Sequence, residues 1–166
     1  MIFVTVGSQK FQFNRLLEKV DQMAGAGAVG EEIIMQTGAG DYIPRNCRYQ
    51  AFYDRELFMD MVEKCSVLIT HGGTGTIVDA VKRGKKTIAV PRLVCYGEHV
   101  DDHQLQLLER FQEMNLIYAC MELEHLPQML QEIRTHRFDR WQSNTDAFVA
   151  AIDGDIQSLA GNRLHF

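Results

Sequence analysis

The segment of the chain best suited to chemistry is glycine-rich and follows a short apolar run. Residues 71–76 read His-Gly-Gly-Thr-Gly-Thr, directly after Leu68-Ile-Thr70. Glycines let backbone N–H groups approach phosphate oxygens, and the N-terminus of a following helix adds about half a positive charge. Thr74 and Thr76 supply hydroxyl donors. The spacing matches neither a P-loop nor the dinucleotide fingerprint, so two readings stay open: a phosphate-binding turn, or only a tight strand-to-helix turn.

Two further groups of residues could bind a metal or react. His99 and His103 stand four residues apart with Asp101 and Asp102 between them, which would suit a metal if this segment were helical. No third ligand cluster accompanies them, and we expect no metal. The four cysteines lie far apart without a C-x-x-C pair, so we expect buried, reduced thiols and no zinc site. A nucleophile elbow, G-x-S-x-G, does not occur.

The elements that position these residues alternate between short apolar runs and longer amphipathic ones. Periodicity predicts strands at 1–6, 33–35, 49–52, 66–70, 87–90 and 116–119, and helices at 16–24, 57–65, 74–82, 104–111 and 126–133. Asp54 is a predicted N-cap. Strands that alternate with helices of this length predict a parallel sheet with helices on both faces, which is a Rossmann-like α/β domain.

Composition restricts the class of protein. The chain has 166 residues, of which 46% are hydrophobic, and we expect a single domain spanning 1–166. A formal net charge of −5 argues against nucleic-acid binding, which favours a basic surface. No apolar run approaches the roughly 20 residues that cross a bilayer, and residues 1–7 lack the features of a signal peptide, so we expect a cytoplasmic protein.

Two surface features each have two readings. The basic run 82–86, Lys-Arg-Gly-Lys-Lys, either complements the dipole at a helix C-terminus or attracts anionic lipid headgroups. In the expected C-terminal helical segment, 144–166, an apolar stripe comprises Phe148, Ile152, Ile156 and Leu159. This stripe either closes the domain's own sheet or docks on another subunit.

In combination, these motifs resemble a known family. The step from His71 to Asp79, then Pro91 and the run 102–104 (Asp-His-Gln), resembles the nucleotide-sugar signature of glycosyltransferases with the two-domain B fold. Residues 5–9, Thr-Val-Gly-Ser-Gln, look like the glycine loop that opens the donor half of such enzymes. The resemblance covers about residues 1–135 and is to family 28-like C-terminal, donor-binding domains. The layout is similar to small one-domain members: the soluble subunit of a two-subunit N-acetylglucosaminyltransferase of dolichol-linked oligosaccharide synthesis, and bacterial counterparts in capsule and exopolysaccharide synthesis.

The resemblance implies a role for each matching residue. The implied donor-binding set is Gly7, Ser8, His71, Gly72, Gly73, Thr74, Gly75, Thr76, Asp79, Asp102, His103 and Gln104. The glycine-rich turn would surround the diphosphate, and Asp79 would accept both ribose hydroxyls, since a carboxylate has two acceptor oxygens. The run 102–104 differs from the tight Asp-Gln pair of the plant enzymes, so which of the three reads the sugar stays open.

The resemblance implies that the chain is the donor-binding part of an enzyme whose active site is completed by a second polypeptide. Transfer of a hexose from a UDP-sugar, with inversion and without a metal cofactor, would need an acceptor-binding partner. That partner would be membrane-anchored, would bring a lipid-linked acceptor to the cytoplasmic face of the membrane, and would supply the catalytic base, which we do not find in this chain. Two other classes stay open: a non-catalytic UDP-sugar-binding regulatory subunit, and an unrelated Rossmann-like small hydrolase.

Overall fold

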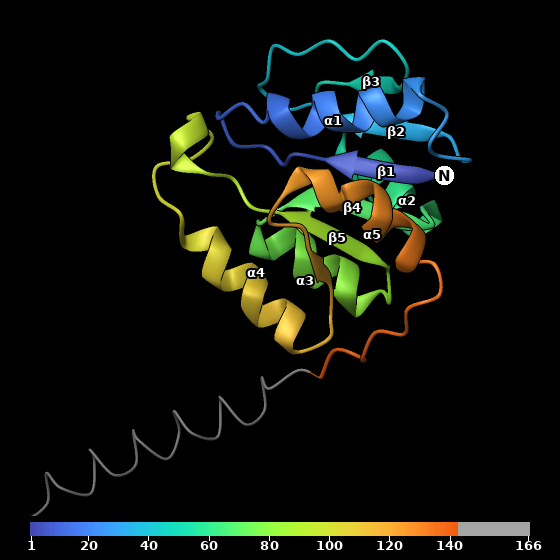
Figure 1. Cartoon of the computed structure of the whole chain (residues 1–166), viewed down its shortest axis with the longest axis vertical. Coiled ribbons are helices and arrows are strands. Elements are labelled where there is room, and N and C mark those ends of the chain that lie inside the picture. The colour runs from blue at the N-terminus through green and yellow to red at the C-terminus, as the bar shows by residue number, and fades with distance from the viewer. Residues whose placement is uncertain (143–166) are drawn as a thin grey trace, which may run out of the picture.

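The computed structural model describes residues 1–142 and contains a single parallel sheet within them (Figure 1). Its six strands are ordered β3-β2-β1-β4-β5-β6, and every neighbouring pair is parallel. The strands are β1 (Ile2–Thr5), β2 (Ile33–Gln36), β3 (Arg48–Gln50), β4 (Val67–His71), β5 (Thr87–Val90) and β6 (Tyr118–Ala119). Strands β2 and β3 lie on one side of β1, and β4, β5 and β6 lie on the other, so the strand order reverses between β1 and β4. We call this place the reversal point. In sheets of this order, ligands bind beyond the carboxyl ends of the strands at that reversal point.

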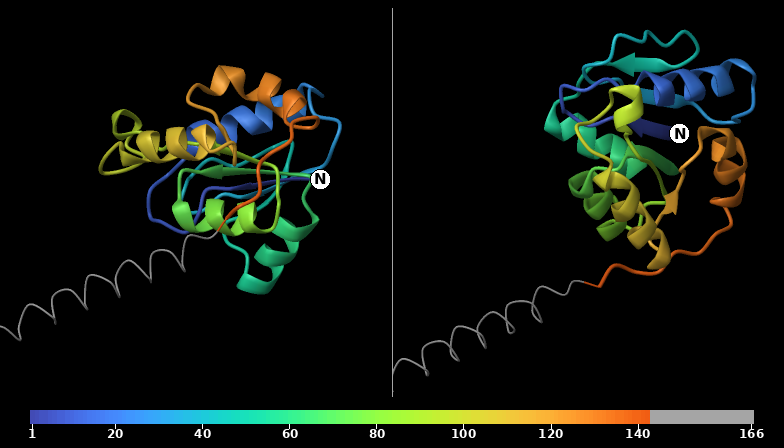
Figure 2. Two further views of the ribbon diagram at one scale, coloured as in Figure 1. Left: turned by 90° about the horizontal axis from the view of Figure 1, so that it is seen from below. Right: turned by 60° about the vertical axis from the view of Figure 1, so that its left-hand side comes forward.

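Helices cover both faces of the sheet, as the sequence predicted (Figure 2). They are α1 (Asn14–Gly25), α2 (Arg55–Lys64), α3 (Thr74–Lys82), α4 (His103–Glu113) and α5 (Leu126–Glu132), with short 3-10 turns η1 (Val94–Tyr96) and η2 (Leu123–His125). Helices α1 and α5 pack on one face. On the other face, α2 packs over β1 and β4, while α3 and α4 pack over β5 and β6.

The packing follows from alternation along fully buried strands. Ile2 and Val4 of β1 contact the α1 side, whereas Phe3 between them contacts α2, where its ring meets Phe58 edge-on at 5.5 Å. Burial on both faces is typical of parallel strands. Helix α2 begins as predicted at Asp54, whose carboxylate accepts the Leu57 N–H at 2.9 Å.

Some predictions about individual elements were wrong. The expected strand 116–119 pairs only over Tyr118–Ala119, although Leu116 and Ile117 are buried. Cys65 and Cys120 are buried, but Cys95 in η1 is exposed and Cys47, which packs at the margin of the core, is half-buried. The predicted helical segment 144–166 lies outside the described residues. Among residues 1–142, no helix combines the length and apolarity needed to cross a bilayer.

A buried carboxylate fixes the long loop between β2 and β3. Asp21 on α1 is 2% exposed and accepts the backbone N–H groups of Arg45 (2.9 Å) and Asn46 (2.8 Å) and the hydroxyl of Tyr42 (3.0 Å). Burial alone would raise the pKa of Asp21, but these hydrogen bonds outweigh it and hold the pKa below its ordinary value. The charged form therefore stabilises the fold.

We predict that Asp21→Asn lowers the free energy of unfolding by about 1–3 kcal/mol at pH 7, since hydrogen bonds to a charged acceptor are lost. A carboxyl group with a lowered folded-state pKa contributes stability above its unfolded pKa and loses it as pH falls through the folded pKa. The difference from wild type should therefore shrink below about pH 4. Urea unfolding at several pH values measures it.

The matched control is Glu18→Gln, an exposed acid on the same helix. It should change stability by less than about 0.5 kcal/mol at every pH. An Asp21→Asn variant as stable as this control at pH 7 would contradict the role assigned to Asp21.

Candidate functional site

The candidate site lies at the reversal point, where β1 and β4 end side by side. Gly7 follows β1 and His71 ends β4, and a Cβ placed on Gly7 would lie 2.5 Å from the His71 ring. Gly7 also has a positive φ of 78°. A Cβ on Gly73 would clash with the same imidazole. Glycine is required on both sides of His71 because the ring occupies the space that side chains would need.

His71 is held in its neutral form. The side chain is buried, and burial together with the positive charge of Arg92 lowers the pKa of His71 to about 4. The hydroxyl of Thr70 lies 3.4 Å from Nδ1. At neutral pH the imidazole therefore offers one donor and one acceptor nitrogen but no charge.

Besides the buried charge of Arg92, helix α3 contributes positive potential at the site. Its N-cap is Gly73, which provides no side chain to bond the first N–H groups of the helix. Thr74 and Gly75 in the first turn are exposed, and Thr76 is half-buried. Unpaired N–H groups and the helix dipole make such a terminus suited to an anion.

The glycine turn is tied to the next loop by Gln104. This side chain is 3% exposed, and its amide oxygen accepts the N–H of Gly72 at 3.1 Å and the N–H of Arg92 at 3.0 Å. Gly72 follows β4 and Arg92 follows β5, so one residue of α4 fixes both loops. The N–H of Gly72 and the amide oxygen of Gln104 thus bond to each other in this structure. That Gly72 and Gln104 contact the nucleotide-sugar stays a prediction.

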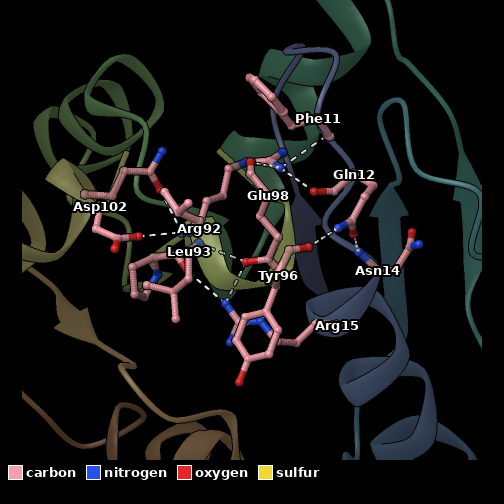
Figure 3. A network of polar contacts seen from close by, with 12 residues as sticks. Phe11, Gln12, Asn14, Arg15, Arg92, Leu93, Tyr96, Glu98 and Asp102 are labelled. Carbon is pink, nitrogen blue, oxygen red and sulfur yellow. Dashed lines mark hydrogen bonds and ion pairs between the residues drawn. The ribbon is translucent and has the colours of Figure 1, made fainter. Parts of the chain in front are cut away.

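Arg92 organises the loop after β1, and sequence reasoning missed it. The residue is fully buried, and its guanidinium lies 4.8 Å from the centre of the Phe13 ring. Figure 3 shows it pointing toward the segment that contains Phe11 and Gln12. The guanidinium donates to four backbone carbonyl oxygens: those of Val6 (2.6 Å), Gln12 (2.7 Å), Phe11 (3.2 Å) and Glu98 (3.3 Å). Burial lowers the pKa of Arg92 to about 10, so the group stays charged at neutral pH. A charged residue two positions after an apolar strand was the available signal.

A buried ion pair completes this network. Glu98 is fully buried, and its two carboxylate oxygens each lie 2.9 Å from a guanidinium nitrogen of Arg15. Glu98 also accepts the N–H of Leu93 at 3.0 Å. Arg15 stands on α1 and Glu98 in the loop after β5, so the pair joins the start of α1 to that loop (Figure 3).

The remaining predicted residues lie near the same edge of the sheet. Asp79 is half-exposed on α3 and pairs with Arg83, with Oδ2 3.2 Å from Nε. Ser8 is exposed after Gly7. Asp102 precedes α4 and accepts the N–H of Val94 at 2.9 Å, which closes the loop that contains η1. The structure thus leaves the donor-binding roles of these residues as predictions.

His103 belongs to a small polar cluster at the start of α4. The ligand-type atoms of His99, Asp101 and His103 lie within 4.8 Å of one another, and both imidazoles contact the Asp101 carboxylate. The hydrogen bond with His103 lowers the pKa of Asp101. His99 precedes the helix, so the helical spacing considered for a metal site does not apply. The three groups are close enough together to bind a cation, but the two imidazoles also pair directly with the Asp101 carboxylate.

Comparison with known sequences identifies relatives. The model of the glycosyltransferase family 28 C-terminal domain matches residues 1–156. The UDP-N-acetylglucosamine transferase subunit ALG13 of Saccharomyces cerevisiae is 28% identical over 99 residues, covering 55% of this chain and 46% of that protein. The human protein of the same name is 25% identical over 128 residues, covering 72% of this chain and 11% of that protein. The chain thus spans less than half the length of these relatives.

Solved structures share the fold. Acinetobacter baumannii MurG is similar with a TM-score of 0.56 at 17% identity, covering 90% of this chain and 48% of that one. The glycotransferase of kitacinnamycin is similar with a TM-score of 0.61 at 16% identity, covering 81% and 35%. The predicted fold class, a Rossmann-like α/β sheet that corresponds to the donor half of a B-fold glycosyltransferase, is confirmed.

We predict that Gln104→Leu lowers the free energy of unfolding by about 2–4 kcal/mol, because two buried N–H groups lose their acceptor at about 1–3 kcal/mol each. Gln104→Glu should lose less, since it keeps an acceptor oxygen. Chemical denaturation measures both variants. The control is Gln106→Leu, an exposed position on the same helix; equal stability of the two leucine variants would rule out the bridging role.

Proposed function

Since the chain belongs to the glycosyltransferase family 28 C-terminal domain family, we propose that it is the donor-binding catalytic subunit of a two-component inverting glycosyltransferase. The subunit would bind a UDP-sugar and transfer its hexose to a saccharide acceptor carried on a lipid. The name of its relatives makes UDP-N-acetylglucosamine the first donor to test.

The observation that carries this proposal is the bare N-terminus of α3 at the reversal point of the sheet. Gly73 leaves the first N–H groups of α3 without a side-chain cap, and Gly7 removes any side chain opposite them. A diphosphate fits this site electrostatically because the helix dipole and the N–H groups favour negative charge. His71 lies between the two glycines and would offer a neutral hydrogen bond to a phosphate oxygen.

The remainder of the donor follows from the same placement. Asp79 lies five residues after Thr74, about 7.5 Å farther along the helix axis, and would meet the ribose of a nucleoside that extends along α3 from the phosphates. Its carboxylate can accept from two ribose hydroxyls once it releases Arg83. Asp102, His103 and Gln104 lie at the start of α4 and would face the hexose.

The reaction would divide between two subunits. An acceptor hydroxyl oxygen attacks the anomeric carbon while the bond from that carbon to the diphosphate oxygen breaks, and the configuration inverts. A base of the partner subunit takes the hydroxyl proton. The departing UDP gains negative charge, which the N-terminus of α3 stabilises in place of a metal ion.

In our proposal, a partner subunit supplies the acceptor-binding site and the catalytic base. Two relatives are named as subunits of a transferase, and the chain covers less than half of the two solved structures described above. We propose a membrane-anchored, acceptor-binding partner that recruits this chain to the cytoplasmic face of a membrane. The alternative is a regulatory subunit that binds UDP-sugar without turnover.

We predict that UDP stabilises the protein with no divalent metal present, by about 2.7 kcal/mol at 100 times its dissociation constant. Asp79→Ala should weaken UDP binding by about 1.5–3 kcal/mol, because hydrogen bonds to a charged group are lost. Thermal unfolding with a chelator, together with calorimetry using UDP and a 2′,3′-dideoxy analogue, measures both effects.

Asp60→Ala is the matched control, since Asp60 forms the same exposed i,i+4 ion pair on α2 that Asp79 forms on α3. It should leave UDP binding unchanged. If UDP binds only when magnesium is present, the proposal of a metal-free site is wrong. If the wild type binds UDP and the dideoxy analogue with equal affinity, Asp79 does not bind the ribose.

We also predict that the purified chain alone has negligible transferase activity and gains it when co-expressed with its acceptor-binding partner. Truncation after Asn144 leaves every described element in place and should keep UDP binding while abolishing co-purification with the partner. Sugar transfer to a lipid-linked acceptor is the measurement. Full activity of the chain alone would refute the two-component proposal, and binding without turnover in the complex would favour the regulatory alternative.

A further inference from the structure

A cavity lies at the end of α3 opposite the glycine turn. Its volume is about 660 Å³, and its lining includes Lys82, Lys86, Arg137, Arg140 and Trp141. We call it the basic cavity. It forms where the turn from α3 into β5 meets the segment that follows α5, drawn in orange in Figure 1. Because α3 has nine residues, about 13 Å of helix separates the basic cavity from the turn at Gly73.

The charges of the basic cavity are largely uncompensated. Within residues 1–142, Lys82, Arg137 and Arg140 form no ion pair, whereas Arg83 and Lys85 at the same cavity pair with acids. The ammonium of Lys86 is held by backbone carbonyl oxygens of Ile133 and Arg134, which leaves its charge without an acidic partner. The lining contains one acid, Asp139, in a chain whose net charge is −5.

The helix dipole explains only part of this cluster. Lys82 lies in the last turn of α3, where a cation is favourable. Arg137 and Arg140 follow α5, so their position beside Lys82 owes nothing to that dipole. Two segments about 50 residues apart therefore bring cations to one cavity, and the two arginine side chains are exposed. Guanidinium groups favour phosphate because their paired N–H donors match its oxygens.

An aromatic surface lies next to these cations. Trp141 lines the basic cavity and packs against Phe111 with ring centres 6.4 Å apart. Its indole N–H is buried and has no hydrogen-bond partner among the described residues. Phe138 lines the same cavity. Such a site combines phosphate recognition with an apolar contact, as headgroup binding at a membrane interface requires.

We propose that the basic cavity binds a phosphate group, independently of the donor site. The phosphate can belong to a small soluble molecule or to an anionic lipid headgroup, since both present the same oxygens to Lys82, Arg137 and Arg140. The basic run 82–86 would form one wall of this site, and a lipid headgroup as its ligand would match the second interpretation of that run.

Trp141 provides a direct readout because it is the only tryptophan in the chain. Titration of the full chain with inorganic pyrophosphate, without UDP, should change its fluorescence, and loss of this change in the variant Arg137→Gln, Arg140→Gln separates the basic cavity from the donor site. Vesicles of phosphatidylcholine with about 30% phosphatidylglycerol should bind the protein and phosphatidylcholine alone should not, with binding weakened by salt. Response to pyrophosphate alone assigns a soluble ligand, and response to the charged vesicles assigns a lipid headgroup.

The double variant Arg137→Gln, Arg140→Gln should reduce either response by about tenfold or more. Its control is Arg45→Gln, an exposed arginine without an ion pair on the loop before β3, at the other edge of the sheet. UDP binding by both variants should equal that of wild type, which separates failure of this inference from failure of the donor site. No response to either probe, or a response unchanged in the double variant, would overturn the proposal.

Discussion

The guanidinium of Arg92 is the group around which the candidate site is arranged. A fully buried cation without a carboxylate in direct contact would be costly, so backbone carbonyl groups have to replace water around it. The loop after β1 supplies most of them and is therefore held in one path. That path places Gly7 against His71. The buried pair of Glu98 and Arg15 adds opposite charge nearby and ties the start of α1 to the loop after β5.

Local sequence signals predicted the elements well and the long-range contacts poorly. The bounds of α3 and β5 match the predictions, because glycines precede α3 and Pro91 ends β5. Asp54 was recognised as an N-cap from its own type and position. Arg92, in contrast, contacts residues about 80 positions away, and no periodicity encodes such a contact. The two hydrogen bonds that the Gln104 oxygen accepts were missed for the same reason, because they depend on two loops that meet α4.

The two ends of helix α3 lie in different electrostatic surroundings. At its N-terminus, a neutral histidine, glycines and uncapped helix N–H groups provide partial charges, and the full charge of Arg92 nearby is buried. At its C-terminus, lysines and arginines from two segments gather around a cavity. The two proposed roles would use this difference: dipoles fixed in place suit a leaving group, while fully charged side chains suit the attraction of an anion from solution.

The lengths of the outermost strands restrict how this chain can associate. The sheet ends in β3, three exposed residues long, and in β6, which has two. An added strand would find few backbone groups to pair with at either edge, so aggregation by edge-to-edge pairing is disfavoured. An assembly formed through residues 1–142 would therefore rely on side chains of loops and helices, where substitutions can change specificity without altering the sheet.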